Sequence, residues 1–158
     1  MMIRACTPAE APDIRALLSA AFGQVDEAEL VESLREAGDM ALELVAEHKK
    51  RVVGYVALSR MAAPAGWLAL APVATDPKLR RKGIGSALCQ MAMQYANAPV
   101  VVLGEPAFYG RIGFDFARAK RMTSPFPLSH TGLYAPDLAE AQPQVKLTYA
   151  APFIPDGV

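Results

Sequence analysis

The sequence predicts an α+β fold, and three observations support this prediction. Its 158 residues are enough to bury a sizeable core. Segments with apolar residues at helical spacing are separated by segments that alternate, or that run apolar with β-branched residues. No repeat or change of composition divides the chain. We therefore expect a single domain over residues 1–158, in which helices pack against a sheet.

The expected elements follow the order strand, two helices, three strands, helix, strand, short helix and strand. Strands are expected at 3–6, 42–47, 52–59, 67–74, 100–103 and 145–149, with an extended piece through Phe153. Helices are expected at 11–22, from an N-cap at Asp26 to just before Gly38, at 84–95 and at 108–112. The buried face of the third helix is expected to carry Ile84, Ala87, Leu88, Met91, Ala92 and Tyr95. Pro72 indicates a bulge, an edge or a strand start, with a bulge suiting the residues that follow it, and residues 115–144 show no regular pattern.

A basic turn that contains two glycines joins the strand at 67–74 to the third helix. It reads Arg80-Arg81-Lys82-Gly83-Ile84-Gly85-Ser86. The first N–H groups of a helix lack partners within the helix, and the helix dipole places partial positive charge there. Glycine lets a phosphate approach the backbone closely, and the three basic side chains add full charges. The turn therefore predicts a pyrophosphate site, with a charged helix start that binds nothing as the alternative.

The spacing Arg80-x-x-Gly83-x-Gly85 is neither a P-loop nor a dinucleotide-binding GxGxxG fingerprint. Together with the strand before it and the segment Ala107-Phe108-Tyr109-Gly110-Arg111-Ile112-Gly113-Phe114 after it, it resembles the coenzyme A-binding core of the GNAT superfamily of N-acetyltransferases. The resemblance implies a mixed, mostly antiparallel sheet with helices on both faces. It further implies that the strands at 67–74 and 100–103 are parallel and splay apart to admit acetyl-CoA.

The resemblance also assigns roles to particular residues. It places the backbone of Val73, Ala74 and Thr75 along the pantetheine arm, where a fixed N–H can polarise the acetyl carbonyl. It makes Tyr109 the acid that protonates the departing thiolate, although packing against its aromatic neighbours is the alternative role. The residues implied to bind the phosphates are Arg80, Arg81, Lys82, Gly83, Ile84, Gly85 and Ser86.

Two features depart from the pattern of many members. The turn at 103–106 lacks the asparagine that contacts pantetheine, and in this shortened loop the chain resembles a branch of uncharacterised bacterial acetyltransferases. The strand at 67–74 also contains no carboxylate to act as general base. The acceptor ammonium must lose a proton before it attacks, and the candidates to take that proton are a water chain, Glu105, Glu32, Glu29 and His130.

Composition limits the class of partner. Sixteen basic residues balance sixteen acidic residues, so no overall field favours nucleic acid or an anionic membrane. Two cysteines form no disulfide framework, which favours the cytoplasm. Cys89 stands among apolar helix residues and is expected in the core, not as a nucleophile. The two histidines are far apart in sequence, so no metal site is expected.

The resemblance implies an enzyme that transfers acetyl from acetyl-CoA directly to a primary amine in a ternary complex. The acceptor is either a small-molecule amine or an amine of a protein or peptide, and residues 22–29 and 115–144 are expected to line its pocket. A non-catalytic acyl-CoA-binding regulatory module is the alternative from another class. Nucleotide or nucleic-acid binding at Arg80, Arg81 and Lys82 is a weaker alternative that the neutral net charge opposes.

Overall fold

The computed structural model describes residues 1–137 and 145–154. Within these ranges, six strands form one sheet in the order of the sequence. All neighbouring strands are antiparallel except β4 and β5, which are parallel. The strands are β1 (Met2–Ala5), β2 (Met40–His48), β3 (Arg51–Arg60), β4 (Leu68–Thr75), β5 (Val100–Leu103) and β6 (Thr131–Tyr134). The predicted mixed, mostly antiparallel sheet is confirmed.

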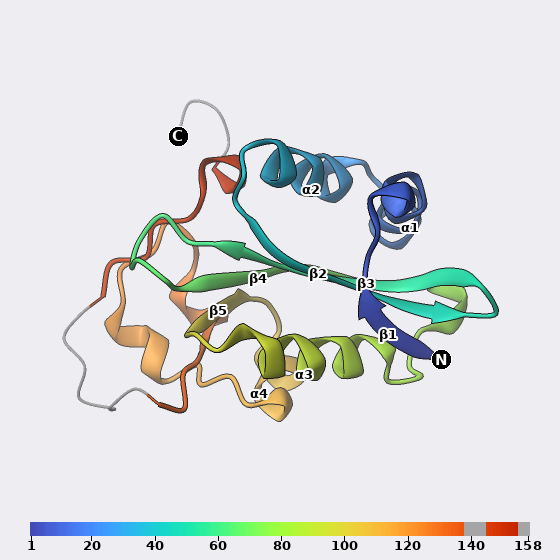
Figure 1. The fold of residues 1–158 in the computed structure, drawn as a ribbon. Helices are drawn as coiled ribbons and strands as arrows, with labels where there is room; N and C mark the ends of the chain where they lie inside the picture. Colours follow the sequence, from blue (N-terminus) through green and yellow to red (C-terminus); the bar gives the residue numbers. More distant parts are fainter. Residues whose placement is uncertain (138–144, 155–158) are drawn as a thin grey trace.

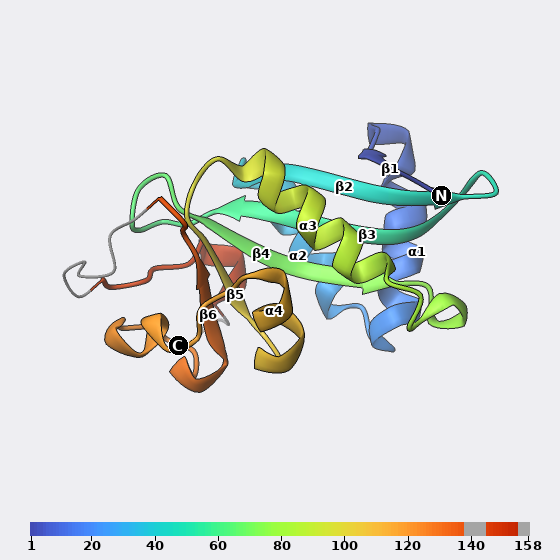
Figure 2. The ribbon, with the colours of Figure 1, turned by 90° about the horizontal axis from the view of Figure 1, so that it is seen from below.

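Helices cover both faces of this sheet, as predicted (Figure 1). The helices are α1 (Ala11–Phe22), α2 (Asp26–Glu36), α3 (Ile84–Ala96) and α4 (Pro106–Ile112). Helices α1 and α2 lie on one face, and α3 and α4 lie on the other. Figure 2 shows α3 crossing the long strands β2, β3 and β4. Each face therefore has its own apolar core, one under α1 and α2 and the other under α3.

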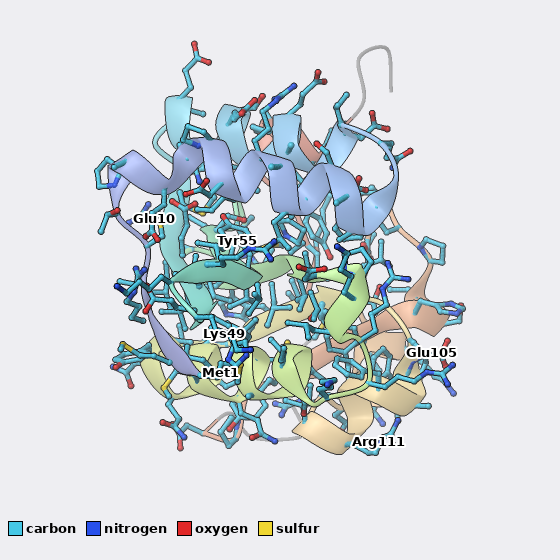
Figure 3. The ribbon with its side chains drawn as sticks, turned by 90° about the vertical axis from the view of Figure 1, so that its right-hand side faces the viewer. Met1, Glu10, Lys49, Tyr55, Glu105 and Arg111 are labelled. Atoms are coloured by element: carbon cyan, nitrogen blue, oxygen red, sulfur yellow. The ribbon has the colours of Figure 1, made fainter. Side chains whose placement is uncertain are left out.

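Strand β3 lies between these two cores and is buried on both sides. Tyr55 and Ala57 belong to the cluster under α1, whereas Val56 and Leu58 belong to the cluster under α3. Figure 3 shows Tyr55 between α1 and the sheet. A Cβ on Gly54 would stand 2.8 Å from side-chain atoms of α3, so the missing side chain lets α3 approach the sheet closely.

Strand β4 pairs with β5 only along its first half, so one edge of its second half is open. Its parallel pairing with β5 runs from Leu68 to Leu70 and ends there. Its pairing with β3 continues to Thr75 across an irregularity at Ala71 and Pro72, where two residues of β4 stand opposite Ala57. The bulge predicted at Pro72 is therefore present. Beyond Leu70, one edge of β4 has no neighbouring strand among the described residues.

The observed helix ends agree in part with the ends predicted from the sequence. The Thr7 N–H donates to Glu10 Oε1 at 2.9 Å before α1 begins, and Gly23 ends α1 with a φ of 69°. The prediction of Asp26 as the cap of α2 is wrong, because Val25 is the N-cap and Asp26 is the first helical residue. An acidic residue is favourable there for another reason, since it faces the positive end of the helix dipole.

The C-terminal part differs most from the expectation. The strand predicted at 145–149 and the extended piece after it are wrong: Lys146 and Thr148 form only isolated bridges, and residues 151–153 form a 3-10 turn. The strand that pairs with β5 is β6, within the segment where no element was expected. Residues 138–144 of that segment lie outside the described residues. The inward position expected for Tyr95 is also wrong, because it is 65% exposed.

Candidate functional site

The open edge of β4 carries the three residues predicted to contact pantetheine. Ala74 is buried toward α1, while Val73 is half-buried beside α3. The Asp76 N–H donates to Val53 O on β3 at 2.8 Å. Because successive amides of a strand point to opposite edges, the N–H groups of Val73 and Thr75 point to the open edge. The described residues therefore leave these two donors available for a ligand.

The N-terminus of α3 lies beside this edge. Gly83 is the N-cap with a φ of 79°, a conformation that glycine adopts without steric cost. The first intrahelical bond runs from Ala87 N–H to Gly83 O at 3.0 Å, so the preceding amides of the first turn have no helical partner. No side chain caps this turn. A Cβ on Gly85 would stand 3.6 Å from Thr75 Oγ1, which places the turn against the end of β4.

The three basic residues before this helix occupy different environments. The Arg80 guanidinium donates to the carbonyl oxygen of Ala21 at 2.9 Å, so it connects the turn to the last turn of α1. Arg81 adopts a left-handed φ of 65°, and both Arg81 and Lys82 are exposed. Neither forms an ion pair among the described residues. Two of the three cations therefore remain available to an anion, while Arg80 already has a partner.

Tyr109 lies on α4, where it is packed by aromatic neighbours and also reaches the cavity at the site. Its ring contacts Phe108 at 4.9 Å and Phe114 at 5.8 Å between ring centroids, both edge to face. Burial raises the pKa of the Tyr109 hydroxyl above its ordinary value of 10. The hydroxyl therefore carries its proton throughout the physiological range. Packing and proton donation are compatible in this geometry.

The shortened turn between β5 and α4 explains how Tyr109 reaches this position. A Cβ on Gly104 would overlap the Tyr109 ring, so glycine at this position makes room for the tyrosine. The Glu105 carboxylate accepts from the Ala107 N–H at 3.5 Å and begins α4 as its N-cap. Figure 3 labels Glu105 and Arg111, which mark the two ends of this helix. The turn thus holds the tyrosine in place with no asparagine present.

A cavity of about 310 Å³ opens where β4 and β5 separate. Val73 and Tyr109 line it, together with apolar residues of both strands. The end of α1 contributes Phe22 to its wall, and the first turn of α2 contributes Glu27. The other lining side chains from the C-terminal half are Phe126, Tyr149 and Phe153. Residues of both segments expected to line the acceptor pocket are thus present. Tyr149 and Phe153 also line it, although the sequence predicts a last strand at 145–149 and an extended piece through Phe153, with no role in the pocket.

None of the four predicted general bases lines this cavity. The carboxylate of Glu32 pairs with Arg15 at 2.6 Å, and that of Glu105 caps α4. His130 Nδ1 lies 3.0 Å from its neighbour Ser129 Oγ, and Glu29 is exposed on α2. Among the described residues, the carboxylate that lines the cavity is Glu27, and no local sequence pattern singles it out.

Other chemistries find little support in the described residues. Cys89 is fully buried, and burial raises the pKa of its thiol to about 12, so it is a core residue and a poor nucleophile. No group of histidine, cysteine and carboxylate side chains within 1–137 and 145–154 is arranged to hold a metal. No helix in the same ranges combines the length and apolar character needed to cross a membrane.

Comparisons with known proteins agree with this geometry. Residues 11–114 match the model of the acetyltransferase (GNAT) family. The chain is 36% identical over 148 residues to the uncharacterized N-acetyltransferase YhbS of Escherichia coli K12, covering 89% of each chain. It is 32% identical over 149 residues to the uncharacterized N-acetyltransferase YjhQ of the same strain, covering 85% of this chain and 82% of the relative.

Two crystal structures share the fold over nearly the whole chain. The structure of Escherichia coli YhbS in complex with CoA matches with a TM-score of 0.87 and 34% identity, covering 99% of this chain and 93% of that one. A GNAT family acetyltransferase from Brucella melitensis in complex with acetyl-CoA matches with a TM-score of 0.82 and 30% identity, covering 97% of both chains. The chain therefore belongs to the acetyltransferase (GNAT) family, a family of acyltransferases.

Proposed function

We propose that this protein is an acetyl-CoA-dependent N-acetyltransferase that transfers acetyl directly to a primary amine, and that residues 1–158 form a single catalytic domain. The observation that carries this proposal is the separation of β4 from β5 after Leu70. It opens a cavity lined by Val73 and Tyr109, with the uncapped start of α3 beside it. The CoA and acetyl-CoA found in the two related structures support the choice of cofactor.

Each part of the site has a physical role in this proposal. Acetyl-CoA supplies the acetyl thioester. The first amides of α3 at Ile84, Gly85 and Ser86 bind its pyrophosphate, and the exposed cations Arg81 and Lys82 add charge. Arg80 acts from its position beside Ala21, where it also fixes the end of α1. Phosphate binding therefore rests mainly on backbone donors.

The end of β4 orients the reacting group. The N–H groups of Val73 and Thr75 pair with the pantetheine arm and the acetyl carbonyl, with Ala74 between them in the strand. A fixed donor becomes more favourable as negative charge develops on the carbonyl oxygen. Tyr109 then donates its proton to the departing sulfur. Burial raises the pKa of the phenol, so Tyr109 holds this proton until the transfer. The cytoplasm is the proposed location, since both cysteines are free thiols.

The test is thiol release from acetyl-CoA, measured with and without an added primary amine. We expect release that depends on the amine and an equal amount of N-acetylated product. Acetyl-CoA alone should stabilise the fold by ~2.7 kcal/mol at a hundredfold excess over its Kd. Stabilisation without thiol release for any amine would contradict catalysis and favour an acyl-CoA-binding regulatory module.

A further inference from the structure

The side of the cavity that faces away from α3 is lined mainly by aromatic side chains. Three aromatic side chains from the C-terminal half form a connected wall, with ring centroids of Phe126 and Tyr149 4.9 Å apart and those of Tyr149 and Phe153 5.6 Å apart. Phe22 faces the cavity from α1. No lysine, arginine or histidine lines the cavity among the described residues. Such a wall suits an apolar or aromatic molecule and offers nothing to balance an anion.

Glu27 is the one carboxylate among the described residues that line the cavity. The amide of Gln24 donates to both of its carboxylate oxygens, at 3.0 and 3.1 Å. Both residues belong to the short connection and first turn between α1 and α2. The carboxylate is therefore held in a defined place at the rim while its remaining lone pairs stay available.

A carboxylate beside aromatic faces is a favourable environment for an ammonium ion. The carboxylate accepts charge-assisted hydrogen bonds, and aromatic rings attract a cation through their quadrupoles; Phe22 and Phe126 line the same cavity as Glu27. The wall offers one further polar group, the Tyr149 hydroxyl, which is buried without a hydrogen-bond partner among the described residues. Burial raises the pKa of Tyr149 to about 12, against a smaller lowering from the nearby Ser124 hydroxyl, so the Tyr149 hydroxyl stays protonated in the physiological range.

The size of the cavity restricts the acceptor further. A volume of about 310 Å³ lies at the lower end of the range for small-molecule sites. The thioester end of acetyl-CoA must occupy part of it, because Val73 and Tyr109 line the same space. The remaining volume therefore suits a small acceptor.

We propose that the acceptor is a small primary amine on an apolar or aromatic body, and that Glu27 binds its ammonium group. This inference rests on the proposed function and deepens it by naming the class of acceptor. Glu27 is not one of the four side chains predicted from the sequence as general bases. Glu27 lines the cavity, and those four side chains do not.

The transfer converts one ammonium ion and one acetyl thioester into an amide and a thiol. The ammonium releases one proton to water at the rim, and the neutral amine stays hydrogen-bonded to the Glu27 carboxylate. The nitrogen lone pair forms the N–C bond with the thioester carbonyl carbon while the C–S bond breaks and its electron pair stays on sulfur. Tyr109 gives its proton to sulfur, and the second proton lost by nitrogen restores the phenol. The products are the N-acetyl amine, the free thiol and one proton.

The experiment measures kcat and KM for 2-phenylethylamine, spermidine and L-glutamate with saturating acetyl-CoA. The proteins are wild type, Glu27→Gln and the control Glu36→Gln, an exposed acid at the other end of α2. We expect 2-phenylethylamine to have the highest kcat/KM. We expect Glu27→Gln to raise its KM by ~10–100-fold, as for the loss of a charged hydrogen bond, and Glu36→Gln to behave as wild type.

A pH series separates charge recognition from a structural effect. As the pH rises from about 7.5 to about 10, the amine loses its charge, so the ratio of KM between Glu27→Gln and wild type should fall toward one. A ratio that stays constant, or an unchanged KM in Glu27→Gln, overturns the role of Glu27. Higher kcat/KM for spermidine or L-glutamate overturns the acceptor class while leaving acetyl transfer intact. Acetyl-CoA binding with no turnover of any amine overturns both proposals.

Discussion

At the scale of single residues, the hydroxyl of Tyr109 is the group on which the proposed chemistry depends most. In Tyr109→Phe the ring and its contacts with Phe108 and Phe114 remain. We expect kcat to fall ~10²-fold, the low end for general acid catalysis, because a thiolate is already a fair leaving group. The Kd for acetyl-CoA should stay the same, since the lost interaction forms chiefly in the transition state.

Steady-state kinetics and calorimetric titration of both proteins check this prediction. A wild-type kcat in Tyr109→Phe would remove the hydroxyl from the mechanism and leave packing as the role of the tyrosine. A parallel loss of kcat and acetyl-CoA affinity would show that the hydroxyl holds the cofactor instead. Alkaline ionisation of Tyr109 should not limit the rate below about pH 10, because burial raises its pKa.

Gly85 tests the pyrophosphate site by steric exclusion. A Cβ at this position meets Thr75, Val73 and Phe108 at 3.6 to 3.9 Å, which is ordinary van der Waals contact. Gly85→Ala should therefore fold normally, and helix propensity should favour it. Gly85→Val adds two methyl groups at the place where a phosphate must approach, so its Kd for acetyl-CoA should rise at least ~10-fold.

Calorimetry on the two Gly85 variants measures this difference, and thermal unfolding without ligand serves as the control for folding. Equal affinity in wild type and Gly85→Val would assign Gly85 to packing between α3 and β4 alone.

At the scale of the elements, an ion-paired cluster joins β1 to the start of α1. Arg4 donates to both carboxylate oxygens of Glu10 at 2.8 Å, and also to Glu47 on β2 at 2.9 Å. Figure 3 shows Glu10 beside the first turn of α1. The hydrogen bonds from Arg4 lower the pKa of Glu10 from 4.5 to about 2. The folded state thus binds this proton less tightly than the unfolded chain does.

This depressed pKa predicts the sign of the pH dependence. The stabilisation from Glu10 is present above about pH 4.5 and is lost as the pH falls toward about 2. Urea unfolding at a series of pH values should show wild type more stable than Glu10→Gln near neutrality, with the difference shrinking in acid. A difference that does not depend on pH would mean that the side chain contributes only uncharged contacts.

The packing of α3 on the sheet can be tested at Gly54. In Gly54→Ala the new methyl group would stand 2.8 Å from Ile84 and Leu88, so one side must move. We expect a loss of ~1–3 kcal/mol in the free energy of unfolding, as for overpacked cores. Gly110→Ala is the matched control, because a Cβ there meets nothing within 4 Å and α4 gains a better helix former. Similar unfolding free energies for both variants would contradict close approach at Gly54.

The sequence predicts the elements well where pattern and local chemistry agree. Strand β5 and the helix ends at Gly23 and Gly113 match because β-branched runs and C-terminal glycines act locally. Strand β6 was not predicted, since its four residues include a glycine and its pairing with β5 depends on the surrounding fold. The segment at 145–149 has a strand-like composition but forms only isolated bridges, because β6 takes the place beside β5.

At the scale of the whole molecule, the cofactor side of the site could be predicted and the acceptor side could not. The end of β4, the glycine turn and the start of α3 lie close together in sequence, so together they indicate a phosphate site. The acceptor side combines Glu27 with aromatic residues more than 95 positions further along the chain, such as Phe126 and Tyr149. Only the folded sheet brings these side chains together, and no local pattern connects them.

In the proposed function, acetyl-CoA binds between the open edge of β4 and the start of α3. Amide hydrogen exchange with and without saturating acetyl-CoA tests this placement most directly, since it reports individual backbone donors. We expect slower exchange at Val73, Thr75, Ile84, Gly85 and Ser86 when acetyl-CoA is bound, with little change on β1. Unchanged exchange at these amides under saturating acetyl-CoA, or protection confined to other elements, would contradict this placement.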